Sequence, residues 1–205
     1  TVDISNATLY NTVLPPFKAA NDAGVRTYMN SFNILNGIPA TGNSYLQRNI
    51  LKEKWNFNGF VVSDWGSIGE MVAHGYSKDT KEAALQAITA GSDMDMESNS
   101  YRNNLADLVK ENKVSIELVD DAVRRILYKK FELGLFDDPY KFSNPKRQKA
   151  ALNNPEHTKI AREIAAKSIV LLKNENNILP LSKELKTIAF IGPMVKPKRM
   201  NHGFW

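Results

Sequence analysis

The sequence predicts an α/β fold in which helices and strands alternate along the chain. Helical patterns precede each of three short apolar runs, and turn residues separate the elements. The run 60–62 is apolar on both faces, as in the central strand of a parallel sheet. The chain has 205 residues, of which 42% are apolar, so it has enough apolar side chains for a packed core.

The first half of the chain predicts three helix and strand pairs. A helix is expected at 5–22, interrupted at Pro15-Pro16 and ended by Gly24, with a strand at 25–32 after it. Turn residues at 36–39 precede a helix that Asn43 caps and that runs to about Trp55. The strand before Asp64 follows that helix.

The third pair begins with a capping box and gives way to a different pattern. Asp79 and Glu82 predict a helix to Ala90, closed by Gly91 and followed by a strand at 92–96. Two helices are then expected, one at 101–112 and one that Ser115 caps and Gly134 ends. We interpret them as outer packing helices.

The second half contains a polar, turn-rich stretch and the start of another α/β pattern. The stretch 137–149 is the best linker candidate. Asn154-Pro155 predicts the start of a helix, and strands are expected at 169–172 and 187–191.

The number of strands limits the architecture. A (β/α)₈ barrel has eight strands and typically about 250 residues, whereas three predicted strands precede the linker here. We therefore interpret the chain as a segment of a larger protein that joins the end of one domain to the start of another. The first residue is Thr1 rather than Met, which also suggests a processed or trimmed product.

Composition argues against several classes of function. The net charge is +5, but the basic residues are scattered among 22 acids, so no nucleic-acid partner is expected. No apolar run approaches the roughly 18 residues of a membrane span, and no membrane partner is expected. The chain has no cysteine, which excludes disulfides and thiolate chemistry. Neither a metal site nor a cofactor is predicted.

The most informative motif is the strand that ends in Ser63-Asp64-Trp65-Gly66. Parallel α/β folds place their chemistry at the carboxyl ends of strands, where Asp64 stands. The alternative is that Asp64 caps the next turn or pairs with a basic residue. Trp65 offers a flat apolar face on which a sugar ring could stack, beside an anion for the anomeric carbon. The alternative for Trp65 is a core or interdomain aromatic.

The wider context resembles glycoside hydrolase family 3 β-glucosidases over essentially the whole chain. The resemblance rests on ordered blocks: Leu14-Pro15-Pro16-Phe17, Met29-Asn30-Ser31-Phe32-Asn33, Asn36-Gly37-Ile38-Pro39, Gly59-Phe60-Val61-Val62-Ser63-Asp64-Trp65, Ala90-Gly91-Ser92-Asp93-Met94-Asp95-Met96, Leu133-Gly134-Leu135-Phe136-Asp137, Ile169-Val170-Leu171-Leu172-Lys173-Asn174 and Ile191-Gly192-Pro193. It implies the C-terminal part of a TIM-barrel-like (β/α)₈ domain at 1–136, a linker at 137–154, and the start of an α/β sandwich domain at 155–205.

The resemblance assigns Asp64 as the catalytic nucleophile of a retaining, exo-acting β-D-glucosidase. Such enzymes need a second carboxyl group about 5 to 5.5 Å away as acid and base. In the family this group comes from a region well downstream, so it is expected to lie outside this chain, and the chain alone is expected to be inactive. Asp93, Asp95 and Glu97 end the next strand, but the family treats similar segments as barrel structure.

The resemblance also suggests residues that bind the sugar. Phe32 stands where family glucosidases often have Tyr, and Met29 is a weaker candidate for a wall of the same subsite. His74 follows the nucleophile loop, although an exposed histidine without a role is the more common case. Trp65 favours the glucosidase branch over the branch that cleaves N-acetylglucosaminides, which tends to carry a second acid there. The expected substrate is a β-linked glucoside or oligosaccharide, and the expected location is secreted or periplasmic.

Two other functions remain open at this point. One is a non-catalytic carbohydrate-binding or scaffold module of the same fold, against which the retention of Asp64 and Trp65 argues. The other is an independent doubly wound domain for a nucleotide or other small ligand. No Gly-x-Gly-x-x-Gly or Walker-type loop follows any predicted strand, which argues against it.

Overall fold

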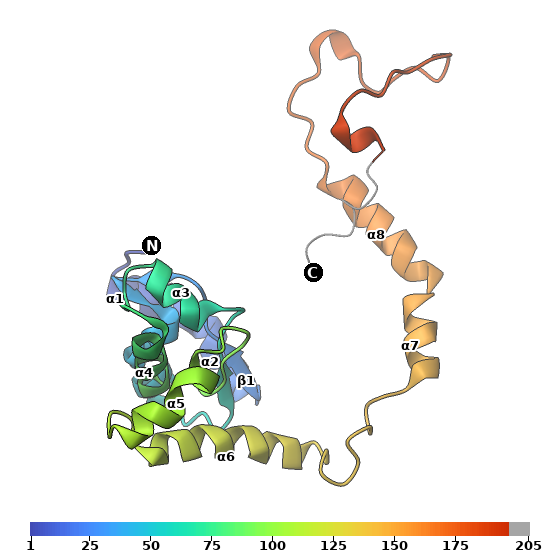
Figure 1. Cartoon of the computed structure of the whole chain (residues 1–205). Helices are drawn as coiled ribbons and strands as arrows, with labels where there is room; N and C mark the ends of the chain where they lie inside the picture. The colour runs from blue at the N-terminus through green and yellow to red at the C-terminus, as the bar shows by residue number, and fades with distance from the viewer. Residues whose placement is uncertain (197–205) are drawn as a thin grey trace. The chain divides into compact units, whose positions relative to one another are not determined.

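The computed structural model describes residues 1–196 and separates them into two units, the first covering Thr1–Ser143 and the second beginning at Asn144. All strands found in the described residues lie in the first unit (Figure 1). Together with the helices around them, these strands make the first unit a helix-rich, mixed α/β structure.

A short parallel sheet holds the first unit together. Strand β1 (Thr27–Met29) pairs in parallel with β4 (Phe60–Val62), so that Thr27 lies opposite Phe60 and Met29 opposite Val62. Met94 adds one parallel bridge on the other side of Val62. The strands predicted at 25–32 and 60–62 are confirmed, with the first shorter than expected. The strand predicted at 92–96 is reduced to this bridge.

The helix before β1 changes its pitch ahead of the two prolines. It consists of α1 (Asn6–Thr8), the π-helical turn η1 (Leu9–Val13) and α2 (Leu14–Asp22). Proline has no N–H to donate within a helix, and its ring clashes with the preceding turn of an α-helix. The wider π-helical turn ahead of the two prolines relieves this clash and leaves room for the missing hydrogen bond. The predicted interruption therefore takes the form of a wider turn. Gly24, at a φ of 84°, ends the helix as expected.

A hairpin and a second helix connect β1 to β4. Strands β2 (Ile34–Leu35) and β3 (Ile38–Pro39) pair around Asn36 and Gly37, which have φ values of 48° and 84°. An Asn-Gly pair favours this type of turn because both residues tolerate positive φ. The short 3₁₀ helix η2 (Ala40–Gly42) and the π-helical η3 (Tyr45–Lys54) follow, and Asn43 Oδ1 accepts the Leu46 N–H at 3.1 Å as the predicted cap.

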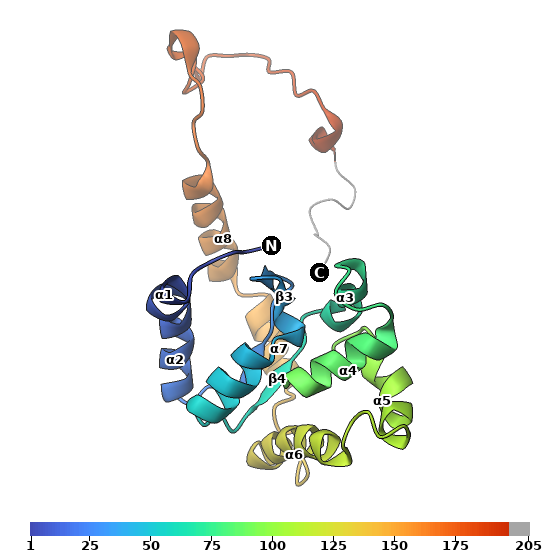
Figure 2. The same ribbon diagram turned by 90° about the vertical axis from the view of Figure 1, so that its left-hand side faces the viewer.

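Four helices of the first unit follow β4, and two of them begin at caps that the sequence predicted. They are α3 (Ser67–Ala73), α4 (Thr80–Ala90), α5 (Ser100–Lys110) and α6 (Ile116–Glu132). Asp79 caps α4 through the Glu82 N–H at 2.8 Å, and Ser115 caps α6 through the Glu117 N–H at 3.1 Å. Figure 2 shows α3, α4 and α5 following one another beside the strands.

Helix α4 forms the centre of the core. One side of it packs Ala84 and Ile88 against α5 and α6 through residues such as Leu108 and Ala122. Another side packs Ala83 and Ala87 against Ile68 and Met71 of α3. Small residues on α4 let these neighbours approach closely, which fixes α3 and therefore the turn that joins it to β4.

The second unit contains two helices followed by loops. Helices α7 (Pro145–Leu152) and α8 (Pro155–Ser168) each begin with an asparagine cap and a proline, at Asn144 and Asn154. The start of α8 was predicted, whereas α7 lies inside the stretch predicted to be a linker. The same cap-plus-proline signal at Asn144-Pro145 could have identified it.

The two strands predicted for the second unit do not form. The segments 169–172 and 187–191 have no strand partner within the described residues, and their apolar side chains are exposed, with Leu172 at 91% and Ile191 at 92%. A strand needs a neighbour for its backbone hydrogen bonds and a surface to cover its apolar side chains. The described residues supply no strand partner for either segment. Among the described residues, every helix is too short or too polar to cross a membrane.

Candidate active site

The alternation of side chains along β4 determines where Asp64 points. Val61 and Ser63 face the packed side and are 1% and 0% exposed, whereas Val62 and Asp64 are only partly buried. Successive residues of a strand face opposite sides, so Asp64 lies on the same face as Val62. The register places Met29, which is 56% exposed, opposite Val62 on that face. The strands therefore bring Met29 and Asp64 to one surface.

A tight turn follows Asp64 and leads into α3. Gly66 has a φ of 76°, a value that glycine adopts without strain, and the Ser67 N–H donates to Asp64 O at 3.1 Å. The Trp65 N–H donates to Asp64 Oδ1 at 2.6 Å. Within residues 1–196, Oδ2 accepts no hydrogen bond and no basic side chain pairs with Asp64. One oxygen thus caps the turn, as the alternative interpretation expected, and the other is available for chemistry.

Buried polar side chains lie beneath this turn and connect five segments of the chain. Asn30 Nδ2 donates to Ser92 Oγ at 2.8 Å, and Asn30 Oδ1 lies 3.1 Å from Thr41 Oγ1, 3.3 Å from Ser67 Oγ and 3.4 Å from the Asp64 backbone N. Gln47 joins the network through Ser92 Oγ at 2.9 Å. All these side chains except Asp64 are buried. Buried polar groups that are all hydrogen-bonded give a rigid, specific arrangement.

The segment after α4 holds the turn from the other side. The Ser63 N–H donates to Met94 O and the Gly66 N–H donates to Met96 O, both at 2.8 Å. The Met96 N–H in turn donates to Ser63 Oγ at 2.8 Å. Backbone groups on both sides of Asp64 are therefore fixed to the segment 94–96.

Asp93 makes a buried ion pair instead of facing the open surface. Its Oδ1 lies 2.6 Å from Lys52 Nζ, and its Oδ2 accepts the Val61 N–H at 2.8 Å. The two charged side chains are only 5% and 3% exposed. Burial lowers the pKa of the Lys52 ammonium and raises the pKa of the Asp93 carboxyl, while the charge of each partner acts against the shift of the other. Asp93 thus fastens η3 to the middle of β4.

Asp95, in the same segment, is also hydrogen-bonded through both of its oxygens. Asp95 Oδ1 accepts a hydrogen bond from Ser98 Oγ at 2.7 Å, and Oδ2 accepts one from the Tyr101 N–H at 3.1 Å. These bonds hold the loop that leads into α5. Asp93 and Asp95 thus both make bonds that hold neighbouring segments together.

The other residues that the sequence singled out differ in their exposure. Trp65 is partly buried, and Phe32, which follows β1, is 40% exposed. No hydrogen bond or ring contact joins Phe32 to Asp64 within residues 1–196. His74 is exposed at the end of α3, where its backbone N–H donates to the backbone carbonyl of Glu70 at 2.9 Å.

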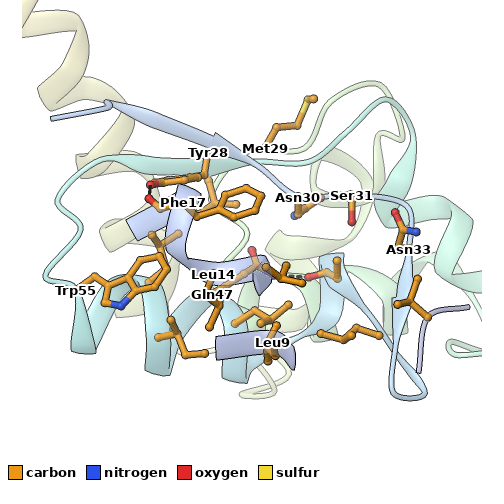
Figure 3. Close-up of a pocket in the computed structure, with 18 of the residues that line it drawn as sticks. Leu9, Leu14, Phe17, Tyr28, Met29, Asn30, Ser31, Asn33, Gln47 and Trp55 are labelled. Atoms are coloured by element: carbon orange, nitrogen blue, oxygen red, sulfur yellow. Dashed lines mark hydrogen bonds between the residues drawn. The ribbon is translucent and has the colours of Figure 1, made fainter. Parts of the chain in front are cut away.

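A cavity of about 330 Å³ lies beside β1, and Met29 and Asn30 are among the residues that line it. It is mainly apolar, and Asp64 and Trp65 do not line it. Figure 3 shows Met29 on the side of β1 away from Leu9, Leu14 and Gln47. A sugar site needs several polar groups directed at the hydroxyls, so this cavity is a poor candidate for the active site. In the described part of the chain, no group of three acidic or histidine side chains could hold a metal ion.

The sequence did not point to the buried polar residues around Asp64. Asn30, Ser63 and Ser92 belong to blocks of the family resemblance, but sequence reasoning assigned no role to these residues or to Thr41 and Ser67. A further signal was position, because Ser63 directly follows a predicted strand, Ser92 begins one and Asn30 lies near the end of another.

Comparison with protein families identifies both parts of the chain. Residues 1–128 match the model described as the glycosyl hydrolase family 3 N terminal domain. Residues 169–205 match the model described as the glycosyl hydrolase family 3 C-terminal domain.

Individual relatives show the same similarity. The chain is 43% identical to a periplasmic beta-glucosidase of Salmonella typhimurium, with 100% of the chain and 27% of the relative covered. It is 36% identical to a beta-xylosidase of Formosa agariphila, with 98% and 29% covered. The crystal structure of a beta-glucosidase from Listeria innocua superposes with a TM-score of 0.73 and 41% identity, covering 89% of this chain and 25% of that one. The chain spans about a quarter of the length of these relatives.

Proposed function

Because the chain belongs to glycosyl hydrolase family 3, we propose that it is a segment of a retaining, exo-acting β-D-glucosidase in which Asp64 is the nucleophile. The observation that carries the proposal is the position of Asp64 at the carboxyl end of β4. Its backbone is held on both sides, and one carboxylate oxygen is unoccupied within residues 1–196. A nucleophile has to be held rigidly while its reacting atom stays accessible.

The proposed reaction has two steps. In the first, an Asp64 oxygen forms a bond to the anomeric carbon, the bond from that carbon to the leaving oxygen breaks, and a second carboxyl group protonates the leaving oxygen. In the second, that group takes a proton from water as the water oxygen bonds to the anomeric carbon and the bond to Asp64 breaks. The sugar leaves with its original configuration, and both carboxyl groups return to their starting states.

We place the acid and base outside this chain. Asp93 and Asp95, in the segment that follows α4, already use both of their oxygens in structural bonds. The proposal also takes 1–136 as the end of a (β/α)₈ barrel, 137–154 as a linker and 155–205 as the start of an α/β sandwich. The chain by itself then lacks the strands and the acid needed for turnover.

The relatives suggest the class of substrate and the location. The Listeria innocua enzyme has been crystallised in complex with glucose, and an aspartate-to-alanine mutant of it with laminaribiose. We propose a β-linked glucoside or oligosaccharide as substrate here, with Trp65, Phe32 and Met29 around the cleaved sugar. The Salmonella relative is named as periplasmic, and we propose a secreted or periplasmic location for this protein.

Covalent trapping tests the nucleophile. The complete polypeptide that carries these residues is treated with an activated 2-deoxy-2-fluoro-β-glucoside, which forms the glycosyl-enzyme but releases it slowly. We expect the label on the peptide that contains Asp64, and no label in Asp64→Ala. Asp95→Asn serves as the control and keeps the label. A label on another carboxylate would refute the assignment of Asp64.

Azide provides an independent test. In Asp64→Ala, azide can occupy the space of the missing carboxylate and attack the anomeric carbon of an aryl β-glucoside, with release of the phenolate. A retaining enzyme that has lost its nucleophile gives the α-glycosyl azide by this route. A β-configured product, or an unchanged rate without azide, would contradict the proposal. Calorimetry of the 205-residue chain with glucose tests the alternative of a binding module without catalysis.

A further inference from the structure

We propose that Asn30 is a positioning residue, which fixes the backbone of Asp64 and so sets where the nucleophile meets the sugar. The proposal rests on the proposed function, because it takes Asp64 as the nucleophile. Asn30 directly follows β1 and belongs to no site that the sequence predicted. Its side chain touches Asp64 only through the backbone, so its role is distinct from that of a catalytic residue.

Asn30 holds β4 at two points on either side of Ser63. Its backbone N–H donates to Val62 O at 3.1 Å, which continues the pairing of β1 with β4 beyond the last strand residue. Its side-chain Oδ1 lies 3.4 Å from the Asp64 backbone N. The same residue therefore fixes the strand just before the nucleophile and the first turn after it.

The Asn30 side chain is itself held in one orientation. It is 8% exposed, its Nδ2 donates to Ser92 Oγ at 2.8 Å, and its Oδ1 also faces Thr41 Oγ1 and Ser67 Oγ. Rotation of the amide by half a turn would place its NH₂ group against the Asp64 N–H and the Ser67 hydroxyl, which are donors themselves. These buried groups would then lose their hydrogen-bond acceptor. Ser67 is the first residue of α3, so the contact also ties the turn to the helix that follows it.

The neutral amide suits this position electrostatically. An acceptor is needed for the Asp64 N–H, but a second carboxylate here would oppose the negative charge of the nucleophile. An asparagine supplies the acceptor without a charge, and its Nδ2 donor engages Ser92. A shift of a reacting group by about 1 Å can reduce a rate roughly 100-fold, so an indirect contact of this kind can matter for turnover.

The first test compares two buried asparagines in the complete polypeptide. Asn43 is 5% exposed, and its Oδ1 accepts the Leu46 N–H, but none of its hydrogen bonds involves Asn30 or Asp64. We expect Asn30→Ala to lower kcat for an aryl β-glucoside by about 10- to 100-fold with KM changed less than about threefold. Asn43→Ala is expected to change kcat by less than about twofold. Equal kcat losses in the two variants would overturn the proposal.

The second test separates positioning from general structural damage. In the Asp64→Ala background with azide, the attacking group is no longer carried by the protein backbone, so Asn30→Ala is expected to change the rate of glycosyl azide formation by less than about twofold. A 10- to 100-fold loss in that background as well would refute positioning. Asn30→Ser, which keeps a hydroxyl in the network but is too short to reach the Asp64 N–H, carries the same tests if Asn30→Ala does not fold.

The controls keep this inference apart from the proposed function. If Asp64→Ala retains turnover without azide, the assignment of the nucleophile is wrong. If Asp64→Ala loses turnover but both Asn30 variants keep the wild-type kcat, only the role of Asn30 is refuted.

Discussion

The end of β4 and the segment after α4 each place an aspartate next to apolar strand residues, but the two carboxylates have different surroundings. Asp93 is 6% exposed and uses one oxygen for Lys52 and the other for the Val61 N–H. Asp64 is more exposed and uses only Oδ1, within its own turn. The two carboxylates thus differ in how many of their oxygens the fold uses.

The comparison shows that a buried carboxylate is not by itself a sign of catalysis. A charge taken out of water is costly unless it is paired, and Asp93 offsets that cost through Lys52 and a backbone N–H. Asp64 avoids part of this cost because its side chain is only partly buried. The following predictions test this difference, beginning with the largest effect.

Asp64→Ala in the complete polypeptide should abolish turnover but leave the fold intact. We expect kcat/KM for an aryl β-glucoside to fall by roughly 10⁴-fold or more, because the covalent step loses its nucleophile. The free energy of unfolding should fall by no more than about 1 kcal/mol, because the variant loses only the hydrogen bond from the Trp65 N–H. Steady-state kinetics and denaturant unfolding check the two expectations. A large loss of stability would mean that Asp64 resembles Asp93 after all.

Lys52→Met should have the opposite profile, with its main effect on stability. It leaves Asp93 as an unpaired buried charge, and breaking such a pair typically costs about 3 to 5 kcal/mol. Hydrogen exchange read by mass spectrometry should show faster exchange in peptides that cover β4. Unchanged exchange there would show that the ion pair does not hold the strand.

Combining Lys52→Met with Asp93→Asn should restore much of that stability. The asparagine keeps an acceptor for the Val61 N–H and removes the unpaired charge. We expect the free energy of unfolding of the double variant to exceed that of Lys52→Met by about 2 kcal/mol, because the double variant no longer buries an unpaired charge. Denaturant midpoints of the four proteins in the cycle provide the measurement. Additive losses would indicate that the two side chains act independently.

Trp65→Ala should weaken sugar binding with a smaller effect than the loss of Asp64. Stacking on an aromatic face contributes about 0.5 to 1.5 kcal/mol, so KM or the inhibition constant of glucose should rise about 2- to 10-fold. Trp55→Ala, which changes a tryptophan of the apolar cavity, is the matched control. If Trp65→Ala changes neither constant, Trp65 is a packing residue.

The smallest predicted effect concerns an exposed ion pair far from both aspartates. Lys81, through its hydrogen bond, and Lys113 lower the pKa of Glu111 to about 2 from 4.5. Because the folded state holds the proton less tightly, the stabilisation is present above about pH 4.5 and is lost as the pH falls towards about 2. The difference in Tm between the wild type and Glu111→Gln should therefore shrink over this range. A constant difference would show that the charge is not responsible.

Local signals determined much of the fold. The caps Asp79, Ser115 and Asn154 fix the starts of α4, α6 and α8, because each satisfies backbone N–H groups that the helix cannot. The Asn36-Gly37 turn and the apolar run of β4 are equally local. The position of Asp64 at the end of a strand also followed from the sequence, as did the resemblance that led to the family.

Only the tertiary structure decided which groups meet. Asp93 differs from Asp64 because Lys52 of η3 forms an ion pair with it. Asn30 contacts the Asp64 backbone because β1 lies beside β4. Neither contact has a sequence signal, since the partners are distant along the chain. The apolar segments 169–172 and 187–191 look like strands in the sequence, but a strand exists only with a partner. Local hydrogen bonds are encoded within a few residues, whereas burial and pairing depend on what the rest of the fold brings near.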